Sequence, residues 1–246
     1  MTVISRIGPP LELVAQRVRH RVLTTMNSPR METVTGSTGE RLLQEAYGTS
    51  PRAQRFYASQ MLDHLNAKMR TFVARQEMMF VSTSDSMGSC DCTFRAGPPG
   101  FVAVLGERRL AWPEYRGNGV MASLGNITEN GHVGLLFVDF LRDVIGLHVN
   151  GRAEIVEDTA FRRLFPEVPV DGVPGRRAER WVQVHVEEAY VHCRKHIPHL
   201  SQQSRRRHWG TDDAQSKGGD YFGVTSTPQP GVRRPRLRPF WSRKRG

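Results

Sequence analysis

Residues 90–137, CDCTFRAGPPGFVAVLGERRLAWPEYRGNGVMASLGNITENGHVGLLF, decide which fold this chain of 246 residues can adopt. They read as strand, turn, strand, glycine-rich polar loop, short helix and strand. Gly106 and Glu107 mark a turn between two apolar runs, and residues 134–137 (GLLF) close the stretch as a buried strand. The loop at residues 116–119 (RGNG) leads directly into the predicted helix. The stretch therefore predicts antiparallel strands with a single inserted helix.

The loop and the helix start combine residue types that suit a bound phosphate. Glycines let the backbone approach a ligand, a helix N-terminus offers free N–H groups, and Arg116 supplies positive charge. Asn118, Ser123 and Asn126 add polar side chains, so these four residues are the predicted phosphate contacts. Taken alone, RGNG is a weak signal, because an ordinary loop that leads into a helix capped near Ser123 would show the same pattern.

The flanking sequence predicts a mixed fold. Helical signals cover residues 40–47, 51–65 and 67–76, and from residue 78 the hydrophobic period changes to that of strands. Residues 145–157 alternate cleanly between apolar and polar, as do residues 181–186, and residues 190–193 extend that second strand. The predicted fold class is mainly β with helices (α+β), a split β-barrel of about six strands preceded by N-terminal helices.

Charge is distributed unevenly along the chain. Residues 201–246 hold eleven Lys and Arg but three acidic residues, a net charge of +8, whereas the first 200 residues carry +3. The last segment is rich in Gly, Ser, Pro and Arg, so we predict a largely disordered basic tail. The predicted organisation is an N-terminal extension (1–35), a barrel domain with leading helices (36–200) and this tail (201–246).

Three roles are open for the basic tail. It is either a solvated end, a weak contact for polyanions such as RNA, or a contact for an anionic membrane surface. Phe240 and Trp241 lie among its arginines and could stack on bases.

Composition also bears on location and metal binding. No run of about 18 apolar residues predicts a membrane span, and the first 22 residues lack the apolar stretch of a secretory signal. Three cysteines do not suggest a disulfide framework, so a cytoplasmic location is expected. Cys90, Cys92 and the segment His192-Cys193 do not have the spacing of a zinc site. We expect no metal, and we expect Cys90 and Cys92 to be small buried residues.

Several blocks of the sequence resemble the pyridoxamine 5′-phosphate oxidase-like family, the FMN-binding split barrels. The resemblance covers roughly residues 36–198 and favours an FMN-dependent branch other than the true pyridoxamine phosphate oxidases. Those enzymes hold the substrate phosphate with an Arg-x-His pattern, whereas this chain has CRKH at residues 193–196. The blocks that carry the resemblance are residues 39–41 with 47–49, 69–80, 95–101, 116–137 and 149–153.

The resemblance implies a site and an activity. It places Arg95 against the ribityl phosphate of FMN, together with the loop around Arg116, and it places the backbone of Thr93 and Phe94 along the flavin ring. It implies a homodimer and an FMN-dependent oxidoreductase whose small-molecule substrate is unknown. No catalytic residue is predicted, because the flavin itself carries the hydride. The alternative is a non-catalytic protein that binds flavin, a 5-deazaflavin coenzyme or haem, with a basic tail that contacts polyanions.

Overall fold

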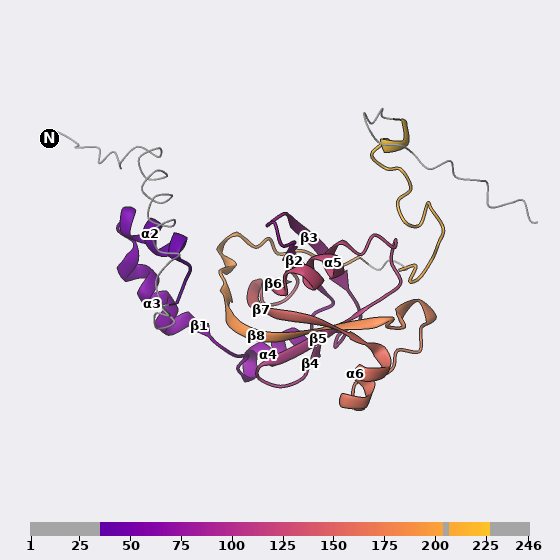
Figure 1. Ribbon diagram of the computed structural model, residues 1–246, viewed down its shortest axis with the longest axis horizontal. Coiled ribbons are helices and arrows are strands. Elements are labelled where there is room, and N and C mark those ends of the chain that lie inside the picture. Colours follow the sequence, from indigo (N-terminus) through magenta and orange to yellow (C-terminus); the bar gives the residue numbers. More distant parts are fainter. Residues whose placement is uncertain (1–34, 204–206, 227–246) are drawn as a thin grey trace, which may run out of the picture.

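The computed structural model describes residues 35–203 and 207–226 (Figure 1). The predictions for most of the N-terminal extension and for Phe240 and Trp241 lie outside the described residues. The described α-helices are α2 (Thr38–Ala46), α3 (Ser50–Gln60), α4 (Ala67–Ala74), α5 (Ala122–Glu129) and α6 (Asp158–Leu164). The strands are β1 (Met61–Leu62), β2 (Met78–Ser84), β3 (Cys90–Ala96), β4 (Ala103–Val104), β5 (Arg109–Glu114), β6 (His132–Asp139), β7 (Ile145–Glu157) and β8 (Arg180–His192).

All eight strands belong to one antiparallel sheet with the order β3-β2-β6-β7-β8-β5-β4, and β1 also pairs with β8. The two longest strands, β7 and β8, pair along their whole length, with a bulge between Asn150 and Gly151. Strand β7 has the bounds that its alternating pattern predicts. The α+β fold is confirmed. The described residues form eight strands where about six were expected, and two of the eight, β1 and β4, contain only two residues each.

Alternate residues of the strands fill the inside of the sheet. Trp112, Phe137 and Met79 are almost completely buried there, and Leu124 and Ile127 of α5 close one side. A smaller cluster lies under α6, where the Phe161 and Trp181 rings stack at 4.0 Å. In β3, Thr93 and Arg95 pair with the buried Val81 and Met79, whereas Phe94 pairs with the partly exposed Phe80 on the other face of the sheet.

The N-terminal helices differ from the prediction at one end. The helix predicted for residues 51–65 stops at Gln60, because Met61 and Leu62 pair with Tyr190 and Ala189 of β8. The backbone of β8 offers hydrogen-bond partners that override local helix propensity, a long-range effect. Helix α2 begins with a capping box between Ser37 and Glu40. Helices α2 and α3 lie beside the barrel, at the left of Figure 1.

The cysteines contradict the expectation of burial. Cys90, Cys92 and Cys193 are all exposed. Strand β3 ends the sheet, and its alternation turns Cys90 and Cys92 to the outside. Apolar character in a strand does not reveal whether that strand lies at a sheet edge. Within residues 35–203 and 207–226, no three His, Cys, Asp or Glu side chains are placed to hold a metal ion, and no helix has the length and apolar character needed to cross a membrane.

Candidate cofactor site

A cavity of about 770 Å³ lies where β3, the loop after β5 and the start of α5 meet. Sites for small molecules have volumes of roughly 300–1,000 Å³, so this cavity has a suitable size. Later parts of the chain complete its wall with Gly175, Glu179, Arg180, Trp209 and Gly210. Six of the seven predicted cofactor contacts line it: Thr93, Phe94, Arg95, Arg116, Asn118 and Ser123.

The loop before α5 depends on two residues in the left-handed region, Gly119 at φ 81° and Met121 at φ 56°. Asn118 fixes the turn, since its Oδ1 accepts a hydrogen bond from the Val120 N–H at 3.0 Å. Helix α5 then begins at Ala122 without a side-chain cap from Met121. The first N–H groups of a helix have no acceptor within it. The start of α5 can therefore offer N–H donors and a positive dipole end to an anion.

Arg95 is held by a buried carboxylate. Its Nε donates to Glu114 Oε1 at 2.8 Å, and its Nη1 donates to Thr93 Oγ1 at 2.9 Å. The same Glu114 oxygen accepts from Trp112 Nε1 at 2.8 Å, and Glu114 is buried. A buried carboxylate requires such partners, because removing a charge from water is costly. Arg95 thus stabilises Glu114 while its guanidinium lines the cavity.

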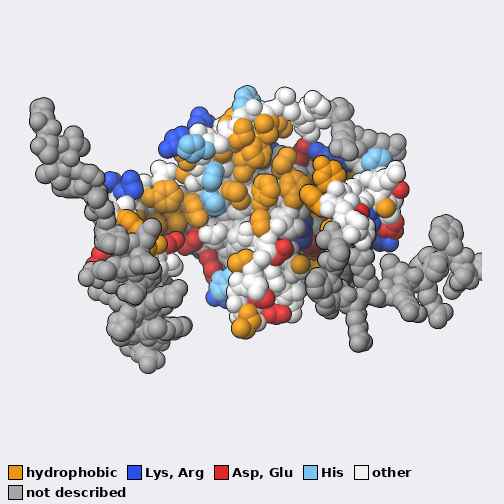
Figure 2. Space-filling model, turned by 90° about the horizontal axis from the view of Figure 1, so that it is seen from above, with side chains coloured by type: hydrophobic (Ala, Val, Ile, Leu, Met, Phe, Trp, Pro, Cys, Tyr) orange, Lys and Arg blue, Asp and Glu red, His pale blue; other side chains and the backbone are white. Residues whose placement is uncertain are grey.

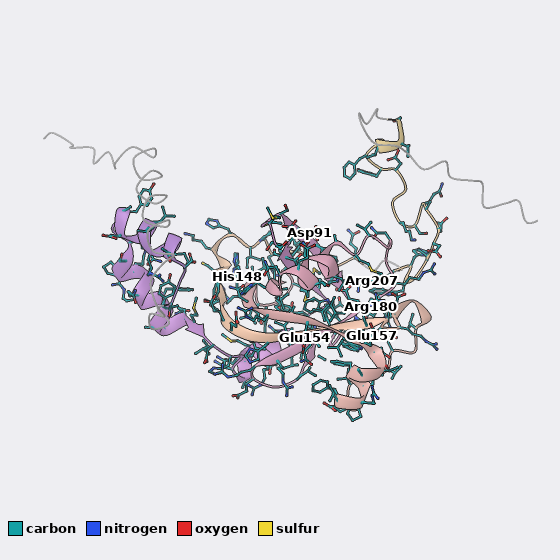
Figure 3. All side chains as sticks on the ribbon, viewed as in Figure 1. Asp91, His148, Glu154, Glu157, Arg180 and Arg207 are labelled. Carbon is teal, nitrogen blue, oxygen red and sulfur yellow. The ribbon has the colours of Figure 1, made fainter. Side chains whose placement is uncertain are left out.

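Two further arginines line the cavity, and each is paired with a carboxylate. Arg116 Nη2 lies 2.8 Å from Asp212 Oδ2, and both side chains are 64% exposed. Arg180 of β8 lies 3.3 Å from Glu179. In Figure 3 Arg180 lies at the same end of the barrel as Arg207. The cavity wall therefore carries both signs of charge, and an anionic ligand would compete with these carboxylates.

The polar residues of α5 have different surroundings. Ser123 Oγ donates to Asp91 Oδ2 at 3.1 Å, at the cavity wall. Asn126, one turn later, donates from its amide to Thr83 Oγ1 of β2 at 3.0 Å and does not line the cavity. The structure thus brings Ser123 to the other predicted contacts and turns Asn126 toward the sheet.

Strand β3 presents a backbone edge at the cavity. It is the last strand in the described sheet, so the N–H and C=O groups on the side away from β2 have no neighbouring strand. Phe94 is half-exposed, and its ring meets the Phe80 ring edge-on at 5.7 Å. This arrangement suits the backbone contacts to a ring that the resemblance implies for Thr93 and Phe94.

Sequence reasoning did not find several residues of the cavity wall, among them Tyr115, Arg180 and Trp209. Burial and the negative charge of Asp171 raise the pKa of Tyr115, so its hydroxyl stays protonated at neutral pH. Trp209 comes from the segment predicted as a disordered tail, yet its ring meets the Tyr115 ring edge-on at 5.9 Å. A tryptophan within a polar, glycine-rich segment was the one signal in the sequence that pointed to this contact.

An antiparallel barrel of this strand order, with a polar loop and a short helix at one end, has the fold of the flavin-binding split barrels. A sequence model described as pyridoxamine 5′-phosphate oxidase matches residues 65–193. The chain therefore belongs to the pyridoxamine 5′-phosphate oxidase family, and the resemblance seen in the sequence is confirmed. No curated protein matches the chain.

Solved structures that are similar to this chain have low sequence identity to it. HupZ from Group A Streptococcus is 22% identical, with a TM-score of 0.38, and the match covers 51% of this chain and 92% of HupZ. General Stress Protein 26 from Bacillus anthracis is 16% identical, with a TM-score of 0.36, over 50% of this chain and 90% of that one. An F420 reductase is 19% identical, with a TM-score of 0.34, over 50% and 94%.

Proposed function

We propose that the cavity binds FMN and that the protein is an FMN-dependent oxidoreductase with a small-molecule substrate. The observation that carries this proposal is the convergence of Arg95, Arg116 and the start of α5 on one cavity of about 770 Å³. Charge and free N–H groups at a helix start are the features that a phosphate requires. Membership of the pyridoxamine 5′-phosphate oxidase family supports the choice of a flavin.

The proposed roles follow from the position of each residue. Arg116, Ser123 and the first N–H groups of α5 would hold the phosphate, with Arg95 as a second cation. The outer edge of β3 at Thr93 and Phe94 would contact the ring. Bound FMN would supply hydride transfer. The protein would bind and orient the cofactor, and we assign no side chain as a general acid or base.

A visible absorption spectrum of the purified protein tests the choice of cofactor. Two flavin bands are expected, and mass spectrometry of the released compound should identify FMN. A Soret band would indicate haem, and a 5-deazaflavin mass would replace FMN in the proposal. Reoxidation of the reduced, bound flavin by candidate acceptors then tests enzyme activity. If no acceptor reacts faster with the bound flavin than with free FMN, the non-catalytic alternative is favoured.

Replacing Arg116 by alanine should weaken FMN binding about tenfold while the melting temperature stays within about 2 °C. One charge-assisted hydrogen bond contributes about 1.5–3 kcal/mol, and the lower end applies because Arg116 is well exposed. Fluorescence titration of FMN measures the affinity. Arg163→Ala, an exposed arginine of α6, is the matched control. Equal affinities for both variants would remove Arg116 from the site.

We also propose that the protein forms a homodimer through the outer face of the sheet. Register pairs place Phe94, Phe80, Leu136, His148 and Tyr190 in one row across five strands, and all five are partly exposed. Burial and the neighbouring His192 lower the pKa of His148, so its ring is neutral at pH 7 and suits an apolar contact. Figure 2 shows hydrophobic side chains gathered on one face of the molecule, with histidines beside them.

Leu136→Glu should convert the dimer into a monomer, because a charge in the centre of an apolar interface is strongly disfavoured. Light scattering measures the mass in solution. Leu164→Glu serves as the control, since Leu164 of α6 is an exposed leucine outside the row. A dimer that persists in Leu136→Glu, or a wild-type monomer, would contradict this interface.

We also propose a cytoplasmic location and a weak contact of the basic tail with polyanions. Three exposed thiols without a disulfide in the described residues are compatible with a reducing cytoplasm. The arginines at residues 233–245, which carry the predicted polyanion contact, lie outside the described residues.

A further inference from the structure

The segment of residues 207–213 contacts the wall of the cavity through Trp209. The Trp209 ring meets Tyr115 edge-on, and the Arg176 guanidinium lies 5.5 Å from the centre of the Trp209 ring. The backbones of Gly175 and Gly210 approach so closely that a Cβ on Gly175 would lie 2.3 Å from the Trp209 carbonyl carbon. This contact requires glycine at both positions, so it is a close packing contact and more than a passing approach of an exposed loop.

The same segment places a negative charge next to Arg116, a residue of the cavity wall. Asp212 pairs with Arg116 at 2.8 Å and with Lys217 at 3.0 Å. Arg116 is the loop cation to which we assign a phosphate contact. Both Asp212 and Arg116 are well exposed, so water can compete for the pair and a ligand can displace the carboxylate. Asp212 therefore forms an ion pair with Arg116, the arginine to which an incoming phosphate would bind.

Glu77 also contacts the segment. Arg207 Nη2 lies 3.3 Å from Glu77 Oε2, which accepts from Gln202 as well. The segment is thus tied to the barrel at Glu77, at Gly175 and at Arg116. The segment itself lies beyond residue 193, where the family match ends, and its partners Glu77, Gly175 and Arg116 lie within the match.

We propose that residues 207–213 form a strap across the cavity. In this strap Trp209 contacts the ligand as part of the cavity wall, and Asp212 forms an ion pair with Arg116 in place of the ligand phosphate. The proposal rests on the phosphate site assigned above. Pairing with Asp212 leaves Arg116 free in only a fraction of the molecules, and the apparent affinity for phosphate is the intrinsic affinity multiplied by that fraction. Trp209 would cover the ligand once the phosphate is bound and slow its release.

Isothermal titration with inorganic phosphate tests the role of Asp212 without any flavin. Asp212→Asn should bind phosphate about two- to fivefold more tightly than wild type, the range expected for releasing an exposed ion pair. Asp213→Asn is the matched control, because it removes the same charge from the neighbouring position, where the carboxylate accepts from the Ser216 N–H. The gain should vanish in Arg116→Ala/Asp212→Asn. Equal affinities in Asp212→Asn and Asp213→Asn, or no phosphate binding by Asp212→Asn, would overturn the proposal.

Stopped-flow mixing with FMN tests the role of Trp209. Trp209→Ala should release FMN about fivefold faster than wild type, since contact with an aromatic ring contributes about 1 kcal/mol. Unchanged release in a protein that binds FMN would overturn the wall role while the proposed function stands. A wild-type protein that binds phosphate but not FMN would contradict the proposed function and leave the competition by Asp212 in place.

Discussion

Arg95→Ala is expected to lower the free energy of unfolding by about 3 kcal/mol. Removing one partner of a buried ion pair costs about 3–5 kcal/mol, and the lower end applies because the Arg95 side chain is 22% exposed. The variant leaves Glu114, 9% exposed, with its charge and with Trp112 Nε1 as a remaining donor. In a chain of this size the melting temperature should fall by roughly 2–4 °C per kcal/mol. Urea denaturation at pH 7 measures the change directly.

The double variant Arg95→Ala/Glu114→Gln separates this structural role from ligand binding. A neutral amide is cheaper to bury than an unpaired carboxylate, so the second substitution should recover part of the lost stability. FMN titration of this stabilised double variant then shows whether Arg95 also contributes to the phosphate site. If Arg95→Ala melts like wild type, Glu114 does not depend on Arg95, and the pair is not a stabilising element of the fold.

Gly151→Ala should destabilise the barrel by about 3 kcal/mol. The Cβ would lie 2.0 Å from the carbonyl oxygen of His185, across the bulge between β7 and β8. Overpacking of an interior costs about 1–3 kcal/mol, and the upper end applies because a backbone atom, unlike a side-chain end, cannot rotate away. Thermal unfolding followed by circular dichroism measures the shift.

Gly134→Ala on the adjacent strand β6 is the control for this substitution. Its nearest neighbour would be Asn150 Oδ1 at 3.5 Å, an ordinary contact, so stability should stay equal or rise slightly. Equal effects of the two substitutions would mean that the bulge can relax to accept a Cβ. Glycine at position 151 would then make no special contribution to the stability of the barrel.

Local pattern predicted most of the barrel. Strand β7 could be predicted because its two faces differ in environment, so that Leu147 and Val149 alternate with His148 and Asn150. The end of α3 and the exposure of Cys92 could not be predicted, because both depend on which strand lies at the neighbouring position in space. The hydrophobic period of a sequence shows which residues of a strand face the core, but it does not show which strands lie next to it in the sheet.

Some residues of the candidate site could likewise be predicted from the sequence, and others could not. Arg116 and Ser123 were predicted from the residues around the loop, and Thr93 and Arg95 from the family resemblance. The structure places all four at one cavity. Arg180 and Trp209 reach that cavity from β8 and from beyond the barrel, and no local pattern connects them with the loop. The paired state of each cation also depends on distant partners such as Asp212.

The helices α2 and α3 contain no buried residue, although a capping box starts the first and the Phe56 ring meets Tyr190 edge-on at 5.9 Å. Opening of this helical pair would thus expose little of the core. We therefore expect the pair to unfold as a local event, with a free energy below that of the barrel. Amide exchange in α2 and α3 should therefore report local opening, whereas exchange in β7 and β8 reports global unfolding. Substitutions on the solvent side of the pair can accumulate without loss of the cavity.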